Sequence, residues 1–270
     1  MEKGVPIRSI SRSLATLTAV NRFGSLTMTE IAREISVPYP TACRIVQTLI
    51  YEGFIELEDG RKRYRPTALV ASLAHGFQRP NHLIRIAKPH IRLLTEKIGW
   101  PVTIASRVGR SIMLLDTTFG YSPLSFGLYH AGFTLPLLES AAGKLSLAYC
   151  GVHEREAIYK WIARAENGER LGSKALALQH QTLDRIVKLG YAAQASSQFG
   201  QPRLKHESGT TSAIAVPILA NDSFCASLTV VFFSRALKIS VAVERYLADL
   251  QKAASHIGTD FSDTVNSPQR

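Results

Sequence analysis

The chain has 270 residues, of which 46% are hydrophobic and 20% are charged, a composition typical of globular proteins. No apolar run approaches the roughly 20 residues of a membrane-spanning helix, and the first residues lack the apolar core of a signal peptide. We therefore expect a cytoplasmic protein with no membrane partner, and the length favours two domains. The formal net charge of +11 favours a polyanionic partner, because Lys and Arg side chains that neutralise phosphates release condensed counterions.

The first 35 residues contain the patterns of two helices. A helix that ends near Gly24 is predicted by four apolar residues at helical spacing: Ile10, Leu14, Leu17 and Val20. Thr27 lies three residues before Glu30, which is the spacing of a capping box at the start of a short second helix. Pro38 cannot continue that helix and therefore limits its length.

A third helix is predicted to begin at Pro40, since proline is tolerated in a first helical turn. Its apolar face follows the i, i+3, i+4, i+7, i+8 pattern: Ala42, Ile45, Val46, Leu49 and Ile50. Its opposite face carries side chains that suit a DNA groove: Thr41, Arg44, Gln47, Thr48 and Tyr51. Two helices joined by a brief turn, the second with a polar outer face, are typical of a helix-turn-helix.

A basic hairpin is predicted directly after the third helix. Residues 54–58 form its first strand, and Asp59 and Gly60 are the pair expected in a tight turn. The return strand, 61–65, carries four cations, as a wing along the phosphate backbone requires: Arg61, Lys62, Arg63 and Arg65. Charged edge strands also protect proteins from aggregation, so the hairpin alone leaves both interpretations open. Its position after a helix-turn-helix favours DNA binding.

Several segments, in their order along the chain, resemble the IclR family of bacterial transcription regulators. They run from about residue 8 to residue 235 and include SISRSL (9–14), LTMTEIA (26–32), VPYPTACR (37–44), LIYEGF (49–54), YRPT (64–67), LVASLAHGF (69–77), SAAGK (140–144) and IAVPI (214–218). Pro66 and Thr67 stand where the family often has Leu-Gly. The resemblance implies a winged helix-turn-helix DNA-binding domain over 1–66, a linker helix over 67–79, an effector-binding and oligomerisation domain over 80–260, and a flexible tail over 261–270.

The resemblance also indicates which residues contact DNA. Tyr39, Thr41 and Arg44 lie where the family's recognition helix begins, and Arg12 lies near a phosphate-contacting first helix. The complete predicted set is Arg12, Tyr39, Thr41, Arg44, Thr48, Arg61, Lys62, Arg63 and Arg65. Arg44 is suited to reading a guanine or holding a phosphate, and the second is favoured because most protein–DNA hydrogen bonds reach the phosphates and sugars. The alternative role of the Thr41 hydroxyl is to satisfy backbone donors at the helix start, which is compatible with a phosphate contact.

The remaining chain has the pattern of an α+β domain. Its predicted strands are 102–108, 111–117, 191–195, 211–218 and 225–233, and its predicted helices are 83–98, 141–150, 154–165, 176–189 and 241–256. Such a mixture predicts an antiparallel sheet with helices on its faces. The family resemblance makes this domain GAF-like.

By the same resemblance, a small effector lies between the loop 122–133, the start of the next helix and the late strands. The implied contacts are Leu124, Tyr129, Leu135, Ala141, Ala142, Ala213 and Thr229. Backbone N–H groups at the helix start, 141–144, favour a carboxylate. Phe126, Tyr129 and Phe133 favour an aromatic or phenolic acid from a catabolic pathway over a small keto acid, although such aromatics as often make packing or dimer contacts. Arg107 and His130 are candidate charge partners.

Other chemistry has little support in the sequence. The segment 143–146 resembles the end of a phosphate-binding loop, but Leu138 stands where the first glycine belongs. No Gly-x-Ser-x-Gly motif occurs, and the histidines and cysteines lack the spacing of a zinc site. We therefore predict that the protein is not an enzyme and has no catalytic residue, metal or cofactor.

Two alternatives stay open: a C-terminal domain that serves only to assemble subunits, and an enzyme with an appended DNA-binding domain, which would need a nucleophile such as Cys150. The expected partners are double-stranded DNA with a pseudo-palindromic operator, a small carboxylate and further copies of this chain in a dimer or tetramer. RNA polymerase is an additional candidate.

Overall fold

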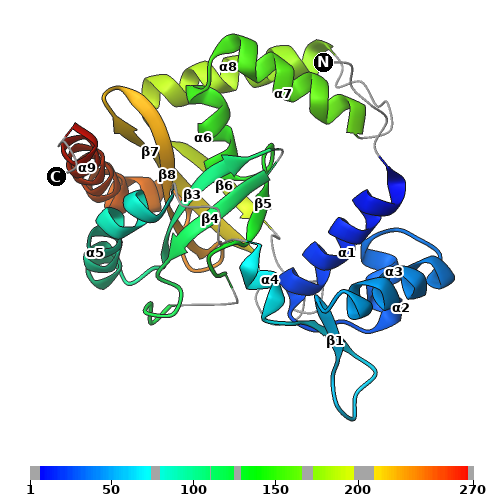
Figure 1. The fold of residues 1–270 in the computed structure, drawn as a ribbon. Coiled ribbons are helices and arrows are strands. Elements are labelled where there is room, and N and C mark those ends of the chain that lie inside the picture. Colours follow the sequence, from blue (N-terminus) through cyan, green and yellow to red (C-terminus); the bar gives the residue numbers. More distant parts are fainter. Residues whose placement is uncertain are drawn as a thin grey trace. The chain divides into compact units, whose positions relative to one another are not determined.

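The computed structural model describes residues 7–73, 80–109, 111–124, 129–165, 173–197 and 210–266. The chain forms two compact units, Met1–Gln78 and Arg79–Arg270 (Figure 1). The finer division predicted from the sequence, with boundaries after residues 66, 79 and 260, stays a prediction.

The N-terminal unit is a three-helix domain followed by a small hairpin. Its elements are α1 (Arg8–Phe23), α2 (Met28–Glu34), α3 (Tyr39–Tyr51), β1 (Ile55–Leu57), β2 (Tyr64–Pro66) and α4 (Leu69–Ser72). Its core comes from one face each of α1, α2 and α3, from the segment between α1 and α2, and from β1: Leu17, Val20, Leu26, Ile31, Ala42, Ile45, Val46, Leu49 and Ile55. The remainder of the predicted linker helix, 74–79, lies outside the described residues.

Local signals in the sequence explain where these helices begin and end. Gly24 has a φ of 74° and donates its N–H to the Val20 carbonyl, which ends α1. The capping box is confirmed: the Glu30 N–H donates to Thr27 Oγ1 at 3.3 Å, and the Thr27 N–H donates to Glu30 Oε2 at 2.8 Å. The predicted apolar face of α3 is buried except for Ile50, which is 39% exposed.

The hairpin differs from its prediction. β1 and β2 pair antiparallel with Leu57 opposite Tyr64, and the Glu58 N–H donates to the Arg63 carbonyl at 2.8 Å, so the loop has four residues, 59–62. Asp59 and Gly60 do form a turn within this loop, but the expected tight turn and the return strand from residue 61 are wrong. The hairpin is attached to the segment between α1 and α2, because Leu26 and Tyr64 exchange two backbone hydrogen bonds.

The C-terminal unit is built on a sheet whose six described strands have the order β5-β4-β3-β8-β7-β6, with every neighbouring pair antiparallel. The strands are β3 (Val102–Val108), β4 (Ser111–Thr117), β5 (Thr134–Pro136), β6 (Ala192–Ser197), β7 (Thr211–Ala220) and β8 (Ser223–Phe233). The helices are α5 (Pro80–Ile98), α6 (Ala141–Tyr149), α7 (Val152–Ala165), α8 (Ser173–Leu189) and α9 (Ile239–Asn266). This architecture confirms the predicted α+β class.

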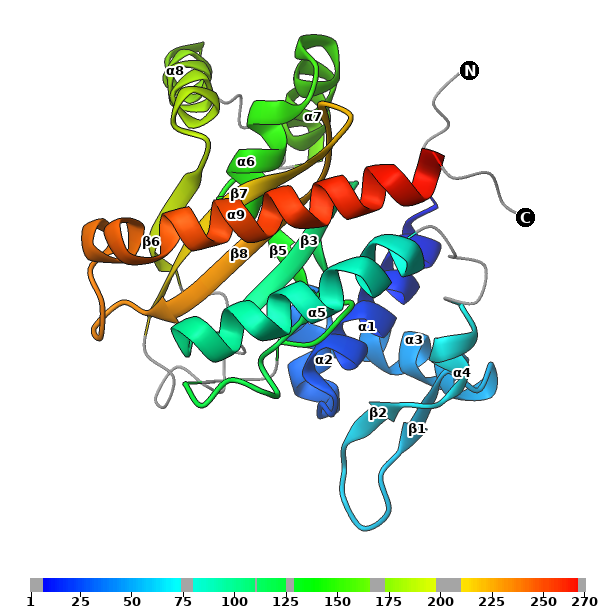
Figure 2. The same ribbon diagram turned by 90° about the vertical axis from the view of Figure 1, so that its left-hand side faces the viewer.

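Helices cover both faces of this sheet (Figures 1 and 2). On the face with α5 and α9, the strands contribute residues such as Ile214 and Leu228 to one core. On the other face, α6, α7 and α8 pack on Ala105, Ala215 and their neighbours in a second core. Side chains alternate along each strand, so a single strand supplies both cores.

Three elements differ from their predictions. α5 begins at Pro80, three residues before the predicted start, and continues through Pro89. β5 was not predicted, because it has only three residues and is defined by its pairing with β4. α9 extends to Asn266, so the tail predicted from residue 261 is wrong in its first part: Ile257 is fully buried and Phe261 packs against the same core, which prolongs the apolar face. None of the described helices is long and apolar enough to cross a membrane.

Candidate nucleic-acid interface and ligand cavity

The outer face of α3 is polar and open to solvent. Arg44 and Thr48 are exposed, Tyr39 is 54% exposed and Thr41 is half-buried in the first turn. The Tyr39 phenol is protonated at neutral pH and can donate a hydrogen bond, and the Cys43 thiol, as the largest influence, raises its pKa further. This face can therefore offer a cation and several hydroxyl groups to a groove.

The basic residues expected in the wing have three different environments. Arg61 and Lys62 are exposed in the hairpin loop, as is Arg12 on α1. Arg65 is exposed but lies directly opposite Glu56 on β1, and its Nε donates to Glu56 Oε1 at 2.7 Å. Only Arg63 is drawn inward.

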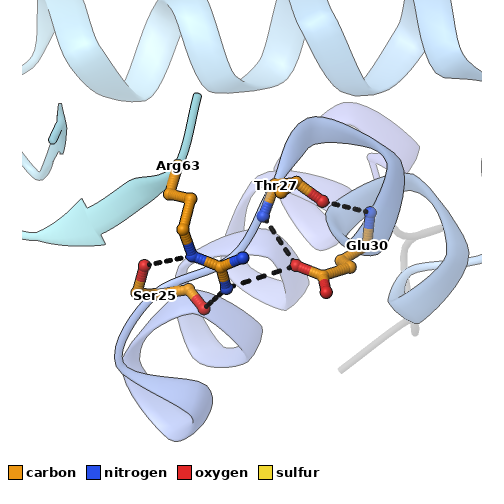
Figure 3. A network of polar contacts seen from close by, with 4 residues as sticks. All are labelled: Ser25, Thr27, Glu30 and Arg63. Atoms are coloured by element: carbon orange, nitrogen blue, oxygen red, sulfur yellow. Dashed lines mark hydrogen bonds and ion pairs between the residues drawn. The ribbon is translucent and has the colours of Figure 1, made fainter. Parts of the chain in front are cut away.

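Arg63 connects the hairpin to the start of α2 (Figure 3). Its Nε donates to Ser25 Oγ at 2.9 Å, and its Nη2 donates to the Ser25 carbonyl at 2.6 Å. Nη2 also lies 3.4 Å from Glu30 Oε2, the oxygen that accepts the Thr27 N–H of the capping box. Protein acceptors thus hold two nitrogens of the Arg63 guanidinium, Nε and Nη2, and the phosphate contact predicted for Arg63 stays a prediction. The capping box was visible in the sequence. No local signal indicated that Arg63 would bind beside it, because Arg63 lies 38 positions after Ser25.

The C-terminal unit contains a partly open cavity of about 40 Å³ between the sheet and α6. Six of the seven predicted effector contacts line it: Tyr129, Leu135, Ala141, Ala142, Ala213 and Thr229. Leu124 does not line it; this side chain is 41% exposed and packs near Gly99. The structure adds lining residues that the sequence prediction missed: Thr103, Leu114, Phe119, Ser140, Gln194, Thr211 and Val231. A usable signal existed for Thr103, a polar residue in the otherwise apolar first half of β3, and it pairs directly with Thr229.

The described walls of the cavity carry hydroxyl and amide groups but no charged side chain. Thr229 is 5% exposed, and its Oγ1 has no hydrogen-bond partner among the described residues. Such an unpaired buried hydroxyl destabilises the empty protein, so it favours a ligand with a complementary polar atom. Gln194 presents its amide beside the cavity, with its Oε1 accepting a hydrogen bond from Lys144 Nζ at 2.6 Å.

The start of α6 forms one end of the cavity and is tightly built. Ser140 Oγ accepts the Gly143 N–H at 3.1 Å, and the Ser140 carbonyl accepts the Lys144 N–H at 3.0 Å. Two of the four amides expected to favour a carboxylate are therefore already bonded. Gly143 is required here because a Cβ atom would lie 1.9 Å from the Leu137 carbonyl oxygen.

The aromatic and charged candidates separate into different roles. The Tyr129 ring packs against Phe133 and against Phe119, with ring centroids 4.8 and 4.9 Å apart. Of these three aromatic residues, Tyr129 and Phe119 line the cavity and Phe133 does not. Phe126 lies outside the described residues. Arg107 forms an ion pair with Glu154 and does not line the cavity. Among the described residues, no cluster of His, Cys, Asp or Glu side chains is arranged to hold a metal ion.

A helix-turn-helix with a basic hairpin, in one chain with a sheet domain that encloses a cavity, defines the class of ligand-responsive transcription regulators. Family models match both units: the IclR helix-turn-helix domain over residues 9–59, and the C-terminal domain of the bacterial transcriptional regulator IclR over residues 78–259. The chain belongs to the IclR family of bacterial transcription regulators.

Curated relatives are also regulators. The chain is 26% identical over 159 residues to the HTH-type transcriptional regulator TsaQ1/TsaQ2 of Comamonas testosteroni, a match that covers 58% of this chain and 57% of that protein. It is 26% identical over 188 residues to the HTH-type transcriptional regulator TtgV of Pseudomonas putida, covering 69% of this chain and 70% of that one.

Solved structures share the fold. An IclR family transcriptional regulator from Brucella abortus has a TM-score of 0.66 at 19% identity, with 94% of this chain and 93% of that chain covered. An IclR homologue from Microbacterium hydrocarbonoxydans, complexed with 4-hydroxybenzoate, has a TM-score of 0.63 at 20% identity, with 94% and 99% covered.

Proposed function

We propose that this regulator binds a small aromatic carboxylate in the cavity of its C-terminal unit, and that the bound acid changes its affinity for operator DNA. The observation that carries this proposal is the cavity itself, which combines apolar side chains, two aromatic rings among them, with the unpaired hydroxyl of Thr229. Apolar lining with a few placed polar groups is the general character of small-molecule sites. The complex of a homologous fold with 4-hydroxybenzoate supports the same ligand class.

The ligand must enlarge the cavity as it binds. About 40 Å³ is far below the several hundred Å³ typical of ligand pockets, so side chains at its edge have to move. A conformational response of this kind is what a sensor needs, because a ligand shifts an equilibrium only through different affinities for two states.

For DNA, we propose that α3 enters the major groove with Tyr39, Thr41, Arg44 and Thr48, and that Arg12, Arg61 and Lys62 contact phosphates. Arg65 contributes to the phosphate contacts only in part, because Glu56 neutralises it. We infer a dimer or tetramer on a pseudo-palindromic operator, with the segment from α4 onward as the link between the two domains.

The enzyme alternative would need an activated nucleophile, and Cys150 does not fit that role. Burial raises the pKa of the half-buried Cys150 thiol, whereas an activated cysteine needs a lowered pKa. We propose that the chain has no catalytic activity of its own.

The proposal is tested by measuring binding of the full-length protein to DNA upstream of its own gene, with a panel of benzoates and small keto acids. An aromatic acid should alter the affinity for this DNA. Thr229→Val, which keeps the side-chain shape but removes the hydroxyl, should weaken that acid's binding about tenfold, the factor that corresponds to roughly 1.4 kcal/mol for one buried hydrogen bond, whereas Thr229→Ser should retain it. Specific DNA binding that no acid alters would instead support a C-terminal domain that only assembles subunits.

A further inference from the structure

A second, larger hollow adjoins the ligand cavity. This outer cleft has a volume of about 490 Å³ and is open to solvent. α5 forms one wall with Lys88 and Arg92, the end of β4 and the turn after it form another with Asp116 and Tyr121, and Tyr129 and His130 close the third. All of these residues belong to the C-terminal unit.

The outer cleft is predominantly basic. Lys88, Arg92 and His130 supply two permanent cations and an imidazole against one described carboxylate, Asp116, whose Oδ1 already accepts the Thr117 N–H at 2.8 Å. Arg92 is held in position: its Nη2 donates to the Tyr121 hydroxyl at 2.5 Å, and its guanidinium lies 4.4 Å from the centre of the Tyr121 ring. A guanidinium has five N–H donors, so this contact leaves donors for an anion.

One described residue is common to the walls of the outer cleft and of the cavity. Tyr129 lines both, and its ring packs on Phe119 inside the cavity. The two spaces have complementary chemistry, since the described cavity walls are uncharged and aromatic while the cleft is charged and open. An anion with an apolar ring would therefore meet attractive charge before it reaches the place that accommodates its ring.

We propose that the outer cleft is a docking site for anionic ligands on their way to the cavity, with Tyr129 as the wall between the two sites. The ligand class is a carboxylate joined to an apolar ring. This inference rests on the proposed function, because it names the route by which the acid reaches the cavity and the groups that attract it. Charged clefts raise association rates by focusing the electric field, an effect that weakens as salt is added.

The test measures association and dissociation rates of 4-hydroxybenzoate with the full-length protein by stopped-flow fluorescence. Lys88→Glu reverses one charge of the cleft, and Lys188→Glu, an exposed position on α8 across the sheet, is the matched control with the same net charge. Lys88→Glu should lower the association rate about three- to tenfold at low salt, leave the dissociation rate unchanged and lose its effect at high salt. The neutral analogue 4-hydroxybenzamide should associate equally fast with both variants.

Equal association rates for Lys88→Glu and Lys188→Glu would refute the docking site alone and leave the cavity proposal intact. A loss of the same size with the neutral amide would also refute it, since a structural defect and not charge would then be responsible. Failure of the wild-type protein to bind 4-hydroxybenzoate would refute the aromatic-acid proposal and the docking site together.

Discussion

Replacing Arg63 with Ala separates a positioning role in the wing from direct contact with DNA. The substitution removes both hydrogen bonds to Ser25 and the ion pair with Glu30, while the exposed cations of the loop, Arg61 and Lys62, remain. The matched variant is Arg61→Ala, which removes the same side chain from an exposed position in the hairpin loop.

The magnitude follows from the exposure of the two partners. Arg63 is 21% exposed and Glu30 is 32% exposed, so solvent screens the 3.4 Å ion pair and limits its contribution to less than about 1 kcal/mol. The two hydrogen bonds from a charged donor add more, and together we expect a loss of about 2 kcal/mol in the free energy of local opening. That loss should raise hydrogen exchange of the amides in 25–34 and in the hairpin about thirtyfold.

DNA binding supplies the decisive readout. The slope of log affinity against log salt should fall by about 0.9 in Arg61→Ala, because one phosphate contact is lost. In Arg63→Ala the affinity should decrease while the slope is unchanged, because a displaced wing weakens binding without removing a charge from the interface. A slope reduction in Arg63→Ala equal to that in Arg61→Ala would refute this reasoning and restore Arg63 as a phosphate contact.

Three further predictions concern charge, packing and pH. Glu56→Gln should release Arg65 and increase both non-specific DNA affinity and the salt slope, measured by fluorescence anisotropy; no change would show that Arg65 does not reach DNA. Gly143→Ala should lower the melting temperature and abolish ligand binding, because its Cβ would lie 1.9 Å from the Leu137 carbonyl oxygen, whereas Gly120→Ala, with nothing within 4 Å, should be tolerated in the same thermal scan. Burial lowers the pKa of Lys144, so the unfolded chain holds this proton more tightly, and the Lys144 contribution to stability should increase as pH rises from the folded pKa towards 10.5. In urea unfolding across this pH range, the free energy of unfolding should increase less in Lys144→Gln than in the wild-type protein. Identical pH profiles would contradict a lowered pKa of Lys144.

Local patterns in the sequence were sufficient for most helix limits. The capping box of Thr27 and Glu30 and the glycine at position 24 act within one helical turn, so three or four residues contain all the information that the backbone uses. Periodicity likewise identified the buried face of α3 and the alternating strands of the sheet. The order of motifs along the chain indicated the family, which the family models show.

Contacts between distant segments were decided only by the tertiary structure. Whether a cation of the hairpin faces solvent depends on what lies opposite it, and the acceptors of Arg63 come from a turn 38 residues earlier. The cavity walls come from all six described strands of the sheet and from α6, whose side chains meet only once the register of the sheet is set. Register, loop length and the partner of a buried hydroxyl such as that of Thr229 arise from packing across the whole domain, which no short window of sequence records.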